Sequence, residues 1–208
     1  MRLNAKKKHQ LLYEHYKTTF NQDFSFSVSS KDTLNHITTL IFEPTEEMPF
    51  WKLCTIGASD YKMPKRDIGL GRKANRRNEY VMFISPETSI GQDTSDWLYL
   101  NSILWATAHS TSKNDINLTV SDTIDMELDG KYCGIVLLLP EIMKSPKICK
   151  CYVSKREFIS IFQVMPITRE QLDKKLEKGI DGKYWLMEQF YTHDDEYKLI
   201  SSHPFTTL

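Results

Sequence analysis

The spacing of apolar residues divides the first part of the chain into one helix and several short strands. Leu12, Tyr16 and Phe20 recur at the period of a helix over residues 5–20, which predicts an amphipathic helix at the start of the domain. Beyond it, apolar residues alternate with polar ones or form short continuous runs, and turn-forming residues bound each run. We therefore predict strands over residues 24–28, 36–42, 51–56 and 79–84.

The middle of the chain combines a second helical pattern with a further group of strands. Apolar residues keep a spacing of three to four positions over residues 97–108, and Ser95 and Asp96 stand directly in front of them. Side chains of this type cap helices, so we predict a central helix that begins there. Short apolar runs predict three more strands, over residues 132–139, 149–153 and 158–164.

Two helical patterns close the folded part of the sequence. Thr168 and Gln171 have the spacing of a capping box, in which the Thr side chain accepts from an amide of the first turn and the Gln side chain reaches back. A helix is therefore expected from this point to about Lys178. Residues 179–182 interrupt it with two glycines, and a helical pattern resumes over residues 184–193.

This order of elements predicts the fold class and the domain organisation. The strands come in runs, with helices at both ends and no strict alternation of strand and helix, which is typical of an α+β protein. We expect a mixed, largely antiparallel sheet packed by an N-terminal helix, a central helix and C-terminal helices. The length of 208 residues suits one domain, which we assign to residues 1–193. Residues 194–208 form a polar tail that we expect to be loosely held.

Charged residues are balanced over the whole chain but are concentrated in two segments. Lys plus Arg (27) equals Asp plus Glu (27), so we expect neither nucleic acid nor a membrane as a direct partner. Residues 62–77, called the basic loop below, carry many cations against the single acid Asp67, and Pro64, Gly69 and Gly71 disfavour regular structure there. Residues 115–129, called the acidic segment below, have the opposite charge and predict a second exposed loop.

These two segments supply most of the candidate partner-binding residues. Exposed charge of either sign can guide and orient a protein partner. Trp51 joins them because an aromatic side chain beside Pro49 and Phe50 can lie half exposed at a partner-binding edge, although a core position is the alternative. Two other interpretations of the charged segments remain open. Their side chains are solvated and bind no partner, or the two segments pair with each other and neither recognises a partner. The candidates are Lys65, Arg66, Arg72, Lys73, Arg76, Arg77, Asp115, Asp122, Asp125, Glu127 and Trp51.

The sequence offers no pattern typical of a catalytic or metal site. Cys149 and Cys151 would face the same side of a strand, but a zinc site needs two further ligands, and the six histidines show no metal spacing. No cysteine stands at a helix start, where its pKa would fall. We therefore expect a protein that is not an enzyme and that holds no cofactor or metal.

The four cysteines and the apolar runs also predict the compartment. The basic start of the chain is not followed by an apolar run long enough for a signal peptide. The longest apolar run, residues 134–140, is far shorter than the roughly 20 residues that cross a bilayer. Four cysteines without a dense spacing pattern are typical of reduced thiols. We expect a cytoplasmic protein.

Several segments resemble the Suppressor of fused domain family. Residues 49–59 with Met63 have its aromatic, Leu, Thr, Gly, Ser and Met signature. The passage from Phe162 to Leu172 is similar to its closing strand and the start of the next helix, and is the most specific match. The similar segments follow the family's order from about residue 10 to about residue 192; the others are residues 79–86, 97–109 and 133–140.

The resemblance implies a compact α+β fold and no known chemistry. Animal members bind and restrain a transcription factor through two domains, and the resemblance covers only the first, so the peptide cleft between domains is not carried over. Bacterial single-domain members are often immunity proteins that neutralise a polymorphic toxin. Our leading hypothesis is therefore an immunity protein, or antitoxin, whose partner is a cognate toxin encoded nearby. The alternatives are a regulatory adaptor that holds a cellular protein or peptide and, less favoured, an undetected hydrolase; the sequence does not fix the oligomeric state.

Overall fold

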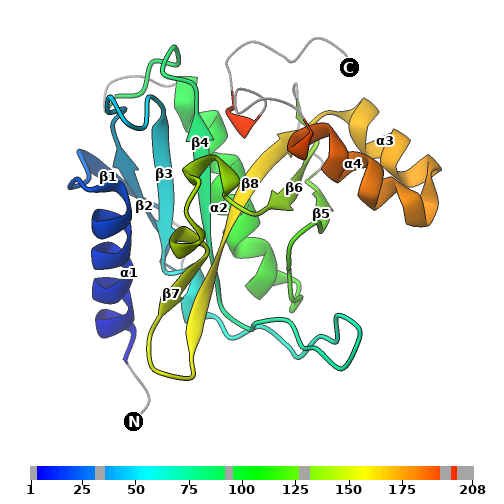
Figure 1. Cartoon of the computed structure of the whole chain (residues 1–208), viewed down its shortest axis with the longest axis horizontal. Coiled ribbons are helices and arrows are strands. Elements are labelled where there is room, and N and C mark those ends of the chain that lie inside the picture. Colours follow the sequence, from blue (N-terminus) through cyan, green and yellow to red (C-terminus); the bar gives the residue numbers. More distant parts are fainter. Residues whose placement is uncertain (1–3, 31–35, 92–95, 127–131, 193–197, 201–208) are drawn as a thin grey trace.

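The computed structural model describes residues 4–30, 36–91, 96–126, 132–192 and 198–200 (Figure 1). Within them, helices and strands follow the order that the apolar pattern predicts, with one additional strand. The helices are α1 (Ala5–Phe20), α2 (Asp96–Lys113), α3 (Arg169–Glu177) and α4 (Gly182–Tyr191), and the short 3-10 helices are η1 (Ala58–Asp60), η2 (Glu141–Met143), η3 (Pro146–Cys149) and η4 (Gly179–Asp181). The strands are β1 (Phe26–Ser29), β2 (Thr38–Phe42), β3 (Trp51–Ile56), β4 (Asn78–Ile84), β5 (Thr123–Asp125), β6 (Gly134–Leu138), β7 (Lys150–Tyr152) and β8 (Phe158–Ile167).

The strands form one mixed sheet, in agreement with the predicted fold class. Their order is β1-β2-β3-β4-β8-β6-β5, and β7 pairs with β8 beside this path. The pairings among the named strands are antiparallel apart from that of β4 with β8, which is parallel. The sheet therefore joins an N-terminal antiparallel group of strands to a C-terminal group through a parallel pair at its centre.

Each face of the sheet is covered by a separate apolar layer. Side chains alternate between the faces along β4, so that Tyr80 and Met82 meet the layer built by α2, α3 and α4, while Val81 and Phe83 meet the other layer. The second layer consists of α1, β7 and the turns η2 and η3. In Figure 1, α1 runs along one side of the sheet, and α3 and α4 project from the opposite side. No helix in the described part of the chain is long and apolar enough to cross a bilayer.

The N-terminal helix is held by the residues that predicted it. Leu12, Tyr16 and Phe20 are fully or almost fully buried against the sheet. The ring of Phe20 packs edge-on against Phe42 of β2, with 4.9 Å between ring centroids. Asn4 caps the helix, because its side chain accepts a hydrogen bond from the amide of Lys7 at 2.9 Å. Burial of this aromatic stripe fixes α1 on its face of the sheet.

The C-terminal helices also begin and end where the sequence predicts. The capping box of α3 is present: Gln171 N donates to Thr168 Oγ1 at 3.2 Å, and Thr168 N donates to Gln171 Oε1 at 2.9 Å. The chain reverses through η4 before α4 starts at Gly182. A Cβ atom on Gly182 would lie 1.8 Å from the carbonyl oxygen of Lys175. The two helices therefore approach so closely that only glycine fits at this contact.

The end of the chain departs from the expected loosely held tail at residues 198–200. Ile200 is 1% exposed and forms a parallel bridge with Ile84 at the end of β4. Its amide donates to Phe83 O at 2.9 Å, and its carbonyl accepts from Ser85 N at 2.8 Å. The buried side chain of Ile200 therefore anchors these residues to the sheet. The predicted cap at Ser95 lies outside the described residues.

Candidate functional site

The basic loop forms a narrow projection at one end of the sheet (Figure 1). Its two arms pair through backbone hydrogen bonds, Ala74 N to Arg66 O at 3.0 Å and Met63 N to Arg76 O at 2.9 Å. An isolated bridge between Asp67 and Lys73 closes the projection toward its tip. The segment is thus more ordered than the irregular loop that its two glycines and Pro64 predict.

Two side chains tie the base of the basic loop to the acidic segment. The Nδ2 atom of Asn117 donates to Pro64 O at 2.8 Å and to Asn75 O at 3.0 Å, and so holds both arms of the loop. The guanidinium of Arg66 donates to Asn117 O at 2.8 Å and forms a bidentate ion pair with Asp122. Asp122 raises the pKa of Arg66 through this hydrogen bond. Pairing between the two segments, one of the alternatives left open by the sequence, therefore occurs at these residues.

The acidic candidates within the described residues are all engaged inside the molecule. Asp122 holds Arg66, and Asp125 receives two hydrogen bonds from Arg169 of α3, at 2.7 and 3.1 Å. Asp115 accepts a hydrogen bond from the hydroxyl of Tyr61. The acidic segment also contains strand β5, which pairs with β6 at the edge of the sheet, so the expectation of an exposed loop is wrong over those residues. Glu127 lies outside the described residues.

The basic candidates divide into an engaged group and an exposed group. Arg77 is buried and donates to the carbonyl oxygens of Ser59 and Asp60, and Arg76 Nε donates to Met63 O at 2.6 Å. With Arg66, these side chains stabilise the loop and its base. The exposed group consists of Lys65, Arg72 and Lys73, whose side chains form no hydrogen bond or ion pair with another described residue.

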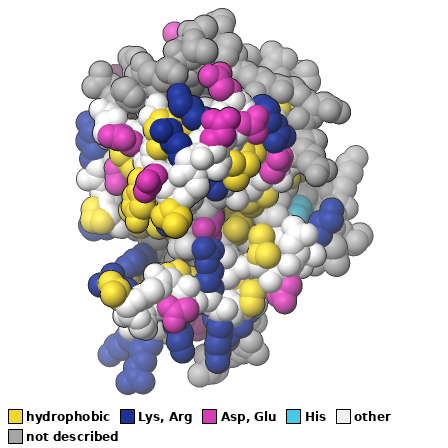
Figure 2. All heavy atoms as spheres, turned by 90° about the vertical axis from the view of Figure 1, so that its right-hand side faces the viewer, with side chains coloured by type: hydrophobic (Ala, Val, Ile, Leu, Met, Phe, Trp, Pro, Cys, Tyr) yellow, Lys and Arg dark blue, Asp and Glu magenta, His cyan; other side chains and the backbone are white. Residues whose placement is uncertain are grey.

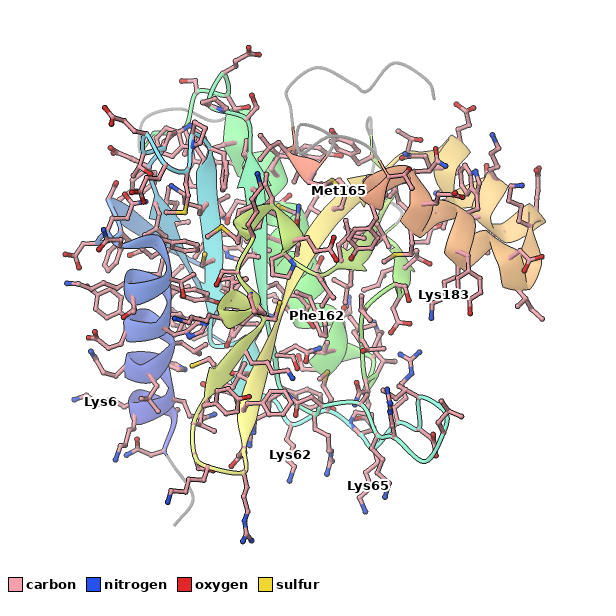
Figure 3. The ribbon with its side chains drawn as sticks, viewed as in Figure 1. Lys6, Lys62, Lys65, Phe162, Met165 and Lys183 are labelled. Carbon is pink, nitrogen blue, oxygen red and sulfur yellow. The ribbon has the colours of Figure 1, made fainter. Side chains whose placement is uncertain are left out.

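The exposed cations gather on the projecting part of the loop. In Figure 3, the side chains of Lys62 and Lys65 point away from the body of the protein, below the loop. Figure 2 looks onto the side that carries the loop and shows Lys and Arg side chains clustered at its lower end. Hydrophobic side chains appear among them, and Leu70 is 95% exposed. This part of the surface combines positive charge with an apolar residue that nothing covers in the described structure.

A groove of about 620 Å³ separates the basic loop from α3 and α4. Lys175 and Lys183 line it from the helices, and Lys183 points from α4 toward the loop in Figure 3. Lys175 Nζ donates to Thr123 Oγ1 of β5 at 3.1 Å. The Arg66–Asp122 pair and Lys65 belong to the same lining, so the loop side of the groove combines a neutralised ion pair with one exposed cation.

Trp51 lies apart from the basic loop. It pairs with Ile84 at the last position of β4, whereas the basic loop leads into the first position of that strand. The indole is half-buried, packs against the apolar layer under α2, and leaves its buried Nε1 without a hydrogen-bond partner among the described residues. The charged candidates and Trp51 therefore do not form one continuous surface.

A buried carboxylate that the charge pattern did not single out lies beneath the base of the loop. Glu79 of β4 is fully buried, and it accepts hydrogen bonds from Thr55 Oγ1 at 2.7 Å, Gly57 N at 3.1 Å and Ser59 N at 2.9 Å. Burial raises its pKa, and these hydrogen bonds act in the opposite direction. Its carboxylate satisfies the free amides at the start of η1. In the sequence, only the position of Glu79 in a segment similar to the Suppressor of fused pattern indicated that this residue matters.

A histidine–carboxylate pair is also present, between α1 and η1. His9 Nε2 lies 2.7 Å from Asp60 Oδ2, and Lys8 Nζ donates to the other oxygen. The adjacent Ser59 hydroxyl is buried. The His9–Asp60 contact joins α1 to η1. A nucleophile must be reachable by both its base and a substrate, so this arrangement with a buried hydroxyl does not supply the parts of a hydrolase site. Among the described residues, no three His, Cys, Asp or Glu side chains are grouped so that they could hold a metal ion.

Comparisons with known proteins agree on one family. The family model of Suppressor of fused protein (SUFU) matches residues 33–193. Among solved structures, the chain is similar to one in the Sufu–Fu complex, with a TM-score of 0.59 and 12% identity over 92% of this chain and 88% of that one. It is similar to Drosophila Suppressor of Fused with a TM-score of 0.58 and 12% identity over 92% of this chain. It spans about half, 49%, of that Drosophila chain. No curated protein matches in sequence.

Proposed function

Because the chain belongs to the Suppressor of fused family, we propose that it is a protein-binding module that acts as an immunity protein and neutralises a cognate toxin by direct binding. Inhibition of this kind requires a rigid scaffold and one surface complementary to the toxin, and no reacting group. Single-domain bacterial relatives often have this role. The toxin would be encoded beside the protein, and both would meet in the cytoplasm, where the four free cysteines remain reduced.

The observation that carries this proposal is the distribution of free charge. In the described part of the chain, the acids of the acidic segment are engaged internally, whereas Lys65, Arg72 and Lys73 are exposed on a projection with a fixed base. Exposed charge on a rigid projection speeds association with a protein of opposite charge and fixes its orientation. The basic loop is therefore the part of the surface most suited to capture a partner.

Co-expression tests this proposal. The product of the adjacent gene is produced in a host cell with and without this chain, and growth is measured together with co-purification of the two proteins. We expect the neighbouring product alone to arrest growth, and this chain to restore growth and to co-purify with it. A chain that leaves the arrest unchanged and does not co-purify contradicts the immunity role.

A regulatory adaptor is the second candidate, favoured by one specific observation. One of the similar folds belongs to a complex of Sufu with a second protein, Fu, so this architecture can hold a protein other than a toxin. An adaptor predicts that the adjacent genes encode no toxin and that a cellular protein binds the chain at a one-to-one ratio. Purification of the chain at its natural expression level, followed by measurement of the mass of the complex, distinguishes the two candidates.

A further inference from the structure

We propose that the tip of the basic loop, residues 67–73, inserts Leu70 into an apolar pocket with an acidic rim on the partner protein. This inference rests on the proposed binding function and deepens it, because it names the residue that enters the partner and the chemistry of the surface that receives it. In this arrangement Leu70 supplies buried apolar contact, and Lys65, Arg72 and Lys73 face carboxylates around the pocket.

The conformation of Leu70 is not explained by packing within the chain. Its side chain is 95% exposed, and its φ angle of 53° lies in the left-handed region, which residues with a Cβ atom rarely adopt. Gly69 and Gly71 on either side also have positive φ angles, of 90° and 69°, and a Cβ on either would meet nothing within 4 Å. Three consecutive left-handed residues turn the apolar side chain outward. Asparagine or glycine would satisfy the same turn without the apolar group.

The charges around the tip specify an acidic receptor. Arg72 and Lys73 are exposed and form no ion pair within the described residues. The single acid of the loop, Asp67, accepts a hydrogen bond from Gly69 N at 2.8 Å and so serves the turn. Ile68, which is 47% exposed, extends the apolar contact. Two copies of the chain would bring like charges together at this tip, so a partner with carboxylates around an apolar pocket fits better than a second copy.

The base of the loop fixes the tip in advance of binding. Asn117 holds both arms, and Arg66 joins the loop to Asp122, while Ala74 is 7% exposed in the body of the protein. At the tip itself, Ile68 N donates to Arg72 O and Arg72 N donates to Gly69 O, each at 3.0 Å. A projection already held in its binding conformation loses little conformational entropy on association, so one exposed leucine can contribute strongly to affinity.

The first experiment measures binding of the purified adjacent-gene product to variants of the full chain. Leu70→Asn removes the apolar group but keeps a residue that tolerates the left-handed conformation. We expect the dissociation constant to rise at least about tenfold, chiefly through faster dissociation, with no loss of thermal stability. The matched control is Ile180→Asn, on an equally uncovered apolar side chain that is 89% exposed on η4. Binding that is unchanged in Leu70→Asn, or weakened equally in the control, overturns the inference.

Charge reversal tests the acidic rim. The double variant Arg72→Glu with Lys73→Glu is compared with Lys155→Glu and Arg156→Glu, two adjacent exposed cations between β7 and β8. We expect the tip variant to associate about tenfold more slowly at low salt, and this difference to shrink as ionic strength rises. The control should associate like the unmodified chain. Equal slowing in both variants would show a general charge effect and contradict an acidic rim at the tip.

A defined probe separates failure of this inference from failure of the proposed function. Methyl NMR spectra of the full chain are recorded with a short peptide of alternating Glu and Leu residues, and with the same peptide carrying Gln in place of Glu. We expect the acidic peptide to shift the methyl signals of Leu70 and Ile68 first, and the Gln peptide to have little effect. If the adjacent-gene product does not bind but these shifts occur, the immunity role fails and the docking tip stands. If the adjacent-gene product binds and Leu70→Asn has no effect on that binding, the docking tip fails and the proposed binding function stands. Absence of the shifts, or equal shifts on α3 and α4, counts against the tip.

Discussion

At the scale of single residues, the contact between α1 and η1 depends on one carboxylate. The hydrogen bond to Asp60 raises the pKa of His9, although burial acts in the opposite direction. Burial alone would raise the pKa of Asp60, but the hydrogen bonds from His9 and Lys8 outweigh it and lower that pKa to about 2. Both shifts favour the charged forms, so the ion pair contributes to stability only while both groups are charged.

The pH dependence of stability checks this contact. Because the pKa of His9 is raised in the folded state, its contribution is complete below 6.5 and is lost as pH rises through the folded pKa. Because the pKa of Asp60 is lowered from 3.8, its contribution is complete above that value and is lost as pH falls toward about 2. We predict that His9→Gln reduces the free energy of unfolding most between pH 4 and 6.5, and progressively less above that range, as measured by urea denaturation at each pH.

The matched control for this prediction is His36→Gln, because His36 is exposed and forms no ion pair with a described residue. Its effect on stability should not follow the same pH dependence. A His9→Gln effect that stays constant from pH 5 to pH 8 would contradict the ion pair.

The sequence predicted which residues of the candidate site are charged but not which of them are free. Arg66 and Arg72 belong to the same basic run, yet Arg66 is held by Asp122, which lies 56 positions further along the chain, and Arg72 is exposed. Such pairing depends on the fold and has no local pattern. The exposed tip was not predicted for a related reason. A leucine between two glycines predicts only a turn, and the exposure and φ angle of Leu70 are known only from the structure.

At the scale of elements, the hairpin of α3 and α4 is set by one close backbone approach. Gly182 has an ordinary helical φ of −60°, so the requirement for glycine comes from the carbonyl of Lys175 and not from backbone conformation. Gly179 differs, because its φ is 56° and a Cβ there would meet nothing within 4 Å. Two glycines in one short connection therefore serve different purposes.

Substitution of each glycine separates the two purposes. We predict that Gly182→Ala lowers the free energy of unfolding by about 1–3 kcal/mol, because the added methyl group forces α4 away from α3. Gly179→Ala should cost about 1 kcal/mol from backbone strain and leave the helix contact in place. Denaturation measures the cost, and amide hydrogen exchange in α4 should accelerate in Gly182→Ala alone. Equal exchange rates in the two variants would show that the close approach is unimportant.

Local signals explain why the ends of most elements could be predicted. The capping box of α3 acts within four residues, and the burial pattern of α1 repeats every turn. Strand β5 carries no such signal, because its three residues lie in a polar, acidic segment and are identified as a strand only by their pairing with β6. The close pairing of β5 with β6 explains the glycine at position 134, because a Cβ there would lie 2.3 Å from Ile124 O of β5.

At the scale of the whole molecule, residues 198–200 return to the centre of the sheet. Ile200 pairs with Ile84, the last residue of β4, and belongs to the apolar layer under α2. The sequence predicted the class of fold because strands and helices are local patterns. It did not predict the parallel pairing of β4 with β8 or the return of Ile200, because both join segments distant in sequence.

Replacement of Ile200 tests how firmly the chain end is held. We predict that Ile200→Ala lowers the free energy of unfolding by about 2–4 kcal/mol, as for other buried aliphatic side chains. Leu199→Ala, on the half-buried neighbour, should cost less. Urea denaturation of both variants provides the measurement. If Ile200→Ala lowers the free energy of unfolding by less than about 0.5 kcal/mol, residues 198–200 are only loosely held, as the sequence predicts.

The parallel pair at the centre of the sheet has a consequence for biosynthesis. Strand β4 is buried at every position and needs β8 along one edge, yet β8 leaves the ribosome only after α2 and the strands that follow it. Until then, the nascent N-terminal strands present an apolar strand with an open edge, the feature through which partly folded chains aggregate. We therefore expect molecular chaperones that shield such edges during translation to raise the yield of folded protein.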